Sequence, residues 1–192
     1  MAAGCSRRFG SEDKRLARLG DGRRLLASSV ERAQAVFALC YVVLREEDDP
    51  AALGLAPGTR LIRAAHAEQG LGSSLADAVH ALEPAPGLEA LAVLLGDMPD
   101  IAPSTLALLG RAAHRDAILC PVHAGRRGHP VLFGRALWPE LRTLAGEPGA
   151  REVIRRHAAR LHRLPVADAG IHRDVDTPAD LDAAAPASSL TE

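Results

Sequence analysis

The sequence predicts an α/β domain in which helices cover both faces of a mostly parallel sheet. Three observations lead to this prediction. Several apolar runs are continuous instead of alternating, which is typical of strands buried on both faces. Amphipathic segments of helical period lie between these runs. Finally, a chain of 192 residues with 47% apolar side chains can enclose one full core.

Each element follows from local patterns. Apolar runs at 36–44, 91–99, 116–122 and 129–133 are predicted strands. Helical periodicity occurs at 25–37, 73–82, 103–114, 135–145 and 151–161. A last helix is expected after Thr177, a capping residue, with Pro178 in its first position and Asp180 in its first turn. Because no repeat or linker divides the chain, we expect one domain over residues 1–186 and a frayed tail at 187–192.

Composition excludes several functional classes. A formal net charge of -1 and an aromatic content of 3% argue against nucleic-acid and anionic-membrane partners. No apolar run approaches the roughly 20 residues of a membrane-spanning helix. Cys5, Cys40 and Cys120 are odd in number and far apart, which is typical of reduced thiols and offers no zinc motif. We therefore expect a cytoplasmic protein.

The opening stretch MAAGCSRRFGSEDK contains Lys14, the only lysine among 23 basic residues. Small residues around Gly4 would let backbone N–H groups approach phosphate oxygens, with Arg7, Arg8 and Lys14 supplying positive charge. The alternative is a solvated basic segment. In a chain that uses arginine elsewhere, a single lysine favours a site that suits a compact point charge.

Two aspartates are candidate metal ligands. Asp97 directly follows a predicted strand, and Asp176 lies in the turn before the last predicted helix. Carboxylate oxygens are suitable ligands for Mg²⁺. Both residues are equally consistent with ordinary turns, and they can share one ion only if their segments end side by side.

Two further segments are ambiguous. Gly70, Gly72, Ser73 and Ser74 predict either a loop on which a nucleoside could lie or a plain turn that caps a helix. His129 precedes a proline and is therefore extended, as a strand entry or as a substrate contact. No set of residues has the spacing of a protein nucleophile with its base. The residues alone thus predict a phosphate-handling domain, and its aspartates are compatible with a Mg²⁺ site.

The chain also resembles a known family. AAGCSRRFGSEDK is similar to the opening signature of the nucleotidyltransferase-fold enzymes. GLGSSL, LLGDMP, GRRGHPVLF, GEPGAR and DVDTPADL resemble, in that order, motifs of the molybdenum cofactor cytidylyltransferases, within the MobA-like group. The resemblance covers nearly the whole chain, and it implies a three-layer, Rossmann-like nucleotidyltransferase fold.

The resemblance implies roles for individual residues. It assigns Lys14, Arg8 and Asp97 to catalysis, with Asp97 and Asp176 as Mg²⁺ ligands. It assigns nucleotide binding to Ala3, Gly4, Ser6, Arg7, Gly70, Gly72, Ser73 and Ser74, and acceptor binding to His129, Arg151 and the loop 146–151. Ala3, Ser6 and GLGSSL resemble the cytidylyl form more than the guanylyl form.

The implied reaction is transfer of CMP from CTP to the molybdopterin-bound molybdenum cofactor, with release of pyrophosphate. A molybdoenzyme or its maturation chaperone would then receive the product. The alternatives are a relative that uses GTP, one that uses a sugar or alcohol phosphate as acceptor, and a non-catalytic module that delivers cofactor.

One departure from the family concerns the first strand. About five strand residues precede the signature in the family, whereas here Met1 occupies its leucine position. We therefore expect the first strand to be truncated, and we hypothesise that translation starts upstream of Met1. Losing buried apolar residues there would cost about 1.5–3 kcal/mol each.

Overall fold

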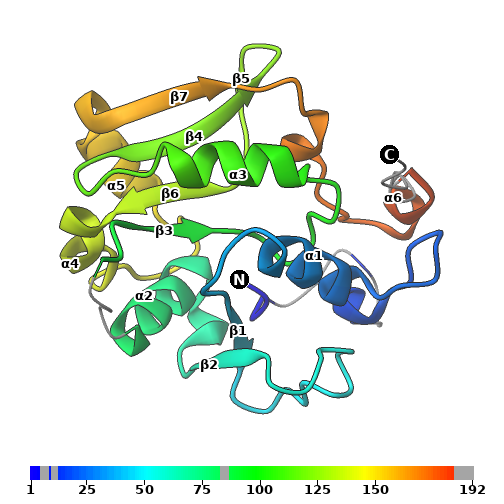
Figure 1. Ribbon diagram of the computed structural model, residues 1–192. Coiled ribbons are helices and arrows are strands. Elements are labelled where there is room, and N and C mark those ends of the chain that lie inside the picture. Colours follow the sequence, from blue (N-terminus) through cyan, green and yellow to red (C-terminus); the bar gives the residue numbers. More distant parts are fainter. Residues whose placement is uncertain (5–8, 10–12, 83–86, 184–192) are drawn as a thin grey trace.

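The computed structural model, which describes residues 1–4, 9, 13–82 and 87–183, has an α/β architecture (Figure 1). One sheet contains β3 (Ala90–Val93), β6 (Val131–Gly134), β4 (Ile118–His123) and β7 (Leu161–Pro165), with β5 (Arg126–Arg127) in a hairpin with the end of β4. A second sheet pairs β1 (Tyr41–Arg45) with β2 (Arg60–Ala64) in parallel. Strands β3, β4 and β7 run in one direction, and β6 and β5 run in the other.

Helices cover the larger sheet on both faces (Figure 1). On one face, α2 (Leu71–Ala81), α4 (Trp138–Leu141) and α5 (Arg151–Arg156) pack on a core that includes Ile118 and Phe133. On the other face, α3 (Pro103–Arg111) contributes Leu109 to a core with Leu119 and Leu132, and it also contacts α1 (Leu25–Gln34). Neighbouring strand residues thus point to opposite layers, as the pleat requires. The predicted α/β fold class is confirmed.

The first residues of the chain lie between the two sheets. The Ala2 N–H donates to the Val43 carbonyl of β1 at 2.9 Å. On the other side, the Gly96 N–H donates to the Met1 carbonyl at 2.9 Å. This short segment is therefore the backbone connection between β1 and the end of β3.

Several predicted elements differ in extent. The run at 36–44 becomes a strand only from Tyr41, because the Val36 and Phe37 N–H groups still bond to Ala33 at the end of α1. The predicted helix 151–161 ends at Arg156, and Leu161 already begins β7. Within 135–145, a short 3-10 helix precedes α4, which spans only Trp138–Leu141.

The last helix, α6 (Pro178–Ala183), begins at the predicted proline. Within the ranges that the structure describes, no helix has the length and apolar character needed to cross a membrane.

Candidate functional site

Lys14 lies between two carboxylates that are far apart in the sequence. Its Nζ atom is 2.7 Å from Asp97 Oδ2 and 3.0 Å from Asp176 Oδ1. The Lys14 side chain is only 13% exposed. Partial burial acts to lower its pKa, but the hydrogen bonds and charges of Asp97 and Asp176 outweigh this effect and the net pKa is raised. The ammonium therefore stays charged over the physiological pH range.

Local backbone contacts place the Asp97 carboxylate. Asp97 follows β3 in a turn that begins at Gly96, where an added Cβ would lie 2.9 Å from Leu26 Cδ1 and 3.2 Å from Ala2 Cβ. Only glycine fits this packing without a shift of its neighbours. The Val175 N–H donates to the Asp97 carbonyl at 2.9 Å, so the C-terminal segment is joined directly to the turn.

Asp180 fixes the backbone that carries Asp176. Its Oδ2 atom accepts hydrogen bonds from the Asp176 N–H at 3.1 Å, the Thr177 N–H at 2.7 Å and the Thr177 hydroxyl at 2.8 Å. These bonds lower the pKa of Asp180, so its carboxylate is ionised at neutral pH. An acid in the first turn that reaches back to the helix start is half of a capping box. The predicted Thr177–Pro178–Asp180 start thus also holds Asp176 in place.

The three charged residues line a cavity of about 410 Å³, a size that suits a small ligand. Among the predicted site residues, its walls contain Ala3, Gly4, Lys14, Gly70, Ser74, Asp97 and Asp176. The walls also include Arg15, Ala67 and Glu68, which the sequence did not single out. Leu71 of the GLGSSL motif and Glu147 of the loop 146–151, which was predicted to bind the acceptor, complete this part of the wall. Segments from both ends of the chain and from the start of α2 thus meet in one place.

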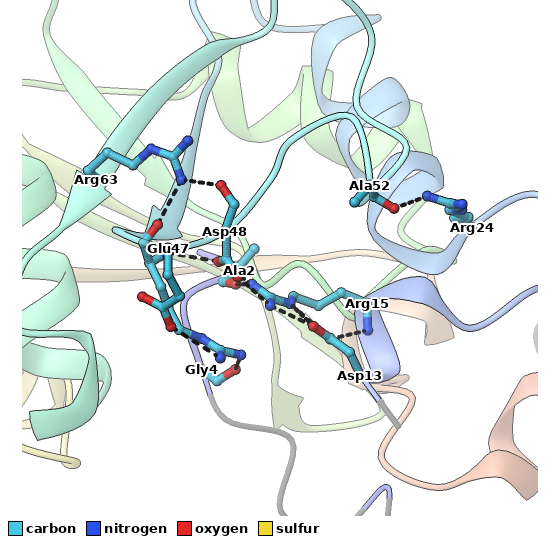
Figure 2. Close-up of polar contacts among 10 residues, drawn as sticks. Ala2, Gly4, Asp13, Arg15, Arg24, Glu47, Asp48, Ala52 and Arg63 are labelled. Atoms are coloured by element: carbon cyan, nitrogen blue, oxygen red, sulfur yellow. Dashed lines mark hydrogen bonds and ion pairs between the residues drawn. The ribbon is translucent and has the colours of Figure 1, made fainter. Parts of the chain in front are cut away.

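A buried arginine links the opening segment to the turn that follows β1. Arg15 is 7% exposed, and its guanidinium contacts both oxygens of Asp48, at 2.5 and 2.7 Å, and both oxygens of Asp13 (Figure 2). It also donates to the Ala2 carbonyl at 2.8 Å. A second guanidinium, that of Arg45, donates to the Gly4 carbonyl at 3.2 Å. Because these carbonyls are bound by guanidinium groups, the segment beside Lys14 has a defined backbone conformation.

Residues 70–74, the predicted glycine loop, both position a neighbouring loop and line the cavity. The backbone at Gly70 has a φ of 115°, and a Cβ there would lie 2.7 Å from the Glu147 nitrogen. The Gly72 N–H donates to the Gly146 carbonyl at 2.7 Å, and Ser73 Oγ accepts from the Gly146 N–H at 3.1 Å. Gly72 and Ser73 therefore hold the loop that carries Glu147, while Gly70 and Ser74 line the cavity.

His129 and Arg151 lie outside the set of described residues that line the cavity. The His129 N–H donates to the Ile171 carbonyl at 2.9 Å, and its Nδ1 is buried with no hydrogen-bond partner among the described residues. Burial lowers the pKa of His129, while the charges of Asp97 and Asp174 oppose this shift. Arg151 is exposed at the start of α5. Ser6, Arg7 and Arg8 fall outside the described residues.

The carboxylates suit a divalent cation that also binds phosphate. Asp97 Oδ1 is buried and has no hydrogen-bond partner within the described part of the chain. An unpaired buried carboxylate oxygen is costly unless a cation or donor reaches it. The described residues contain no cluster of three or more metal-ligating side chains. Mg²⁺ commonly needs only one or two carboxylates when phosphates supply further oxygens.

Comparison with known proteins gives a family and a fold. The family model described as MobA-like NTP transferase domain matches residues 1–161. A homologue of Rv0371c from Mycobacterium sp. strain JC1 is 31% identical with a TM-score of 0.79, over 93% of this chain and 89% of that chain. Rv0371c from Mycobacterium tuberculosis H37Rv is 28% identical with a TM-score of 0.79, over 93% and 91%.

Two further structures are similar. Rv0371c in complex with manganese aligns with a TM-score of 0.68 and 24% identity, over 91% of this chain and 88% of that chain. Molybdopterin-guanine dinucleotide biosynthesis protein A from Archaeoglobus fulgidus aligns with a TM-score of 0.64 and 20% identity, over 94% and 92%. No curated protein matches the chain. The structural matches confirm the nucleotidyltransferase fold.

Proposed function

We propose that this chain, which belongs to the MobA-like NTP transferase family and is a nucleotidyltransferase, transfers CMP from CTP to the molybdopterin-bound molybdenum cofactor. An oxygen of the terminal phosphate on the pterin would attack the α-phosphorus of CTP. The bond between the α-phosphorus and the oxygen that bridges to the β-phosphate would break, and pyrophosphate would leave. Such transfers depend mainly on positioning and charge stabilisation.

The observation that carries this proposal is the position of the Lys14 ammonium. It lies in a cavity beside the small residues Ala3 and Gly4, where a triphosphate can approach the backbone closely. Because the pKa of Lys14 is raised, its side chain stays positively charged. A positive charge at this position would stabilise the negative charge that develops on the α-phosphate and on the leaving pyrophosphate. Arg8, by its resemblance to the family motif, would add a second positive charge.

Asp97 and Asp176 are the residues that would hold Mg²⁺. The buried, unpaired Oδ1 atom of Asp97 supports this assignment, and so does the contact of both carboxylates with one ammonium. When bound, the metal ion would neutralise charge on the phosphate oxygens. The manganese complex of Rv0371c shows that a structurally similar protein takes up a divalent ion.

The start of α2 would hold the nucleoside. Gly70, Leu71 and Ser74 line one wall of the cavity, and Glu147 approaches from the loop that Gly72 and Ser73 position. On this proposal CTP is preferred because the GLGSSL segment resembles the cytidylyl form. His129 and Arg151 would contribute to the acceptor side.

The test measures pyrophosphate release with Mg²⁺ for CTP, GTP, ATP and UTP, with molybdopterin, a sugar phosphate or an alcohol phosphate as the acceptor. We expect release with CTP, and a loss on the order of 10²- to 10³-fold in Lys14→Ala and Asp97→Asn. Arg18→Ala is the matched control, because it removes a positive charge four residues after Lys14 in the sequence. The Arg18 side chain is exposed and donates a hydrogen bond to the Gly22 carbonyl.

Three outcomes would contradict the proposal in different ways. Release with GTP in place of CTP would overturn the choice of base. Release only with a sugar or alcohol phosphate would overturn the choice of acceptor. If calorimetry showed CTP binding but no nucleotide gave pyrophosphate with any acceptor, the chain would be a module that delivers cofactor.

A further inference from the structure

Lys14 contacts the same two carboxylates that the proposed function assigns to the metal ion. Its Nζ atom lies 2.7 Å from Asp97 Oδ2 and 3.0 Å from Asp176 Oδ1. Both distances are those of direct hydrogen bonds between charged groups. A divalent cation held by both aspartates would need oxygens from the same two groups. The Lys14 ammonium thus lies at the point where the two candidate ligands converge.

The two carboxylates need a positive charge between them. The side chains of Lys14 and Asp97 are largely buried, and that of Asp176 is partly exposed. Because little solvent screens the two negative charges, they repel each other more strongly than they would in open water. The Lys14 ammonium, which contacts both, offsets this repulsion. Lys14 is therefore an internal counter-ion of the site.

The second oxygen of Asp97 shows why an ion and the ammonium exclude each other. Asp97 Oδ1 is buried and has no hydrogen-bond partner within the described part of the chain. A cation on this oxygen would share one carboxylate with an ammonium that lies 2.7 Å from Oδ2. Two positive groups on one largely buried carboxylate repel each other. An ion therefore binds Asp97 well only after the ammonium has moved away.

The Lys14 side chain can move while its backbone stays in place. Lys14 begins a short 3-10 helix, and the Asp13 carboxylate accepts a hydrogen bond from the Arg15 N–H at 3.0 Å. The Arg15 guanidinium is held by Asp13 and Asp48 (Figure 2), so the backbone beside Lys14 is fixed. A lysine carries its charge on a flexible stem of four carbons. Rotation of this stem is enough to take the ammonium off both aspartates.

A triphosphate is the group that can draw the ammonium away. Ala3 and Gly4 line the same cavity as Lys14, and the proposed function places the phosphates beside them. Phosphate oxygens bind a lysine ammonium as a point charge, and they also complete the coordination of a divalent ion. Asp97 and Asp176 can then accept the ion in place of the ammonium.

We propose that Lys14 is an internal cation that keeps uncomplexed divalent ions off the Asp97–Asp176 pair and leaves this pair when a triphosphate binds. The inference rests on the proposed function, because it uses the same metal ligands. The site consequently binds a divalent ion poorly by itself and takes it up together with the nucleotide. Its ligand is the complex of a divalent ion with a nucleoside triphosphate.

The first experiment measures Mn²⁺ binding by calorimetry without nucleotide or acceptor. We expect Lys14→Met to bind Mn²⁺ about tenfold or more tightly than the unmodified protein. Lys14→Arg is the matched control, because it keeps the positive charge, and its affinity should stay close to that of the unmodified protein. Adding Asp97→Asn to Lys14→Met should remove the gain, because the amide is a poorer ligand for the ion.

A second experiment follows Lys14 in the unmodified protein, so it does not depend on the folding of Lys14→Met. Lys14 is the only lysine of the chain, and its rate of modification by an amine-reactive reagent can be mapped by peptide mass spectrometry. At constant pH and ionic strength, saturating Mn²⁺ should raise this rate about threefold or more, because the ammonium leaves both aspartates. In Asp97→Asn, Mn²⁺ should leave the rate unchanged.

Four results would overturn the proposal. Equal Mn²⁺ affinity in the unmodified protein and Lys14→Met would mean that the ion binds beside the ammonium without displacing it. A gain in affinity that survives Asp97→Asn would place the ion elsewhere. The absence of Mn²⁺ binding in every variant would show that the aspartates do not take the ion. An unchanged rate of Lys14 modification at saturating Mn²⁺ would show that the ammonium stays between the carboxylates.

These outcomes are separate from those of the proposed reaction. Pyrophosphate release by the unmodified protein, together with no gain of Mn²⁺ affinity in Lys14→Met, would overturn the exchange alone. A gain of Mn²⁺ affinity in Lys14→Met, together with no pyrophosphate release by the unmodified protein with any acceptor, would overturn the proposed reaction and leave the exchange in place.

Discussion

Removing the Arg15 guanidinium should destabilise the protein strongly. The perturbation is Arg15→Met, which keeps an apolar stem but removes the charge. The Asp48 side chain, 7% exposed, would lose both of its Arg15 contacts, and the Ala2 carbonyl would lose a donor. Breaking one partner of a buried ion pair costs about 3–5 kcal/mol. Asp48 keeps the hydrogen bond from the Arg45 N–H at 2.9 Å. We therefore expect the free energy of unfolding to fall by an amount near the lower end of this range, about 3 kcal/mol.

The assay is urea unfolding at pH 7, followed by the fluorescence of Trp138, which is 3% exposed and the only tryptophan. Arg155→Ala is the control, because the Arg155–Glu152 pair is exposed and its loss should leave the free energy of unfolding unchanged within error. The double variant Arg15→Met with Asp48→Leu should recover most of the loss, since an apolar pair replaces the buried ions.

The pH dependence tests the electrostatic cause. Burial acts to raise the pKa of Asp48, but Arg15 and the Arg45 N–H outweigh it, so the net pKa is lowered. In the unmodified protein this carboxylate therefore adds stability above its unfolded pKa of about 3.9, and that stability is lost as the pH falls through the lowered folded pKa. Without Arg15, burial should raise the pKa of Asp48, so the variant should regain stability on acidification. A loss under about 1 kcal/mol, or one equal at pH 7 and pH 4.5, would refute the reasoning.

Three other substitutions test the packing and protonation of the site. Gly96→Ala should lower the free energy of unfolding by about 1–3 kcal/mol, because its Cβ would lie 2.9 Å from Leu26 Cδ1; an unchanged urea midpoint would contradict this. In Gly70→Ala, a φ of 115° is combined with a Cβ 2.7 Å from the Glu147 nitrogen, so we expect lower stability and faster proteolysis of the 145–150 loop. Gly125→Ala is the comparison for a positive φ alone, because a Cβ at Gly125 would meet no neighbouring atom. His129 has a lowered pKa, so its neutral form stabilises the fold above about pH 6.5, and this contribution falls on acidification. In His129→Leu the free energy of unfolding should therefore fall less steeply between about pH 7.5 and 5.5 than in the unmodified protein. Parallel plots of this free energy against pH would contradict the prediction.

The layered architecture could be predicted because its signals are local. Continuous apolar runs gave the positions of β3, β4 and β6, and helical periodicity gave α1, α2 and α3. β7 was missed because its residues Leu161–Pro165 are mostly exposed or half-buried and continue a helical pattern. The decisive constraint there is pairing with β4, which is a property of the tertiary structure.

The candidate site was predictable in part. Lys14 stood out by composition, and Asp97 and Asp176 by their place after a strand and before a helix. That they meet depends on the hydrogen bond between Val175 and the Asp97 carbonyl, which has no sequence signature. The Arg15 cluster was missed for a similar reason: Asp48 lies 33 residues away, and no spacing rule links the two. The sequence therefore indicates the chemical groups, while the fold decides which of them share a cavity.

The contact between Lys14 and Asp176 joins residues 162 positions apart. During synthesis, Lys14 is translated first, and Asp176 follows only 162 residues later. Nascent chains consequently cannot bring Lys14, Asp97 and Asp176 together before residue 176 has left the ribosome. Fragments that stop at residue 161, the limit of the family match, would lack Asp176 and the Val175 tether, even though they retain most of the sheet.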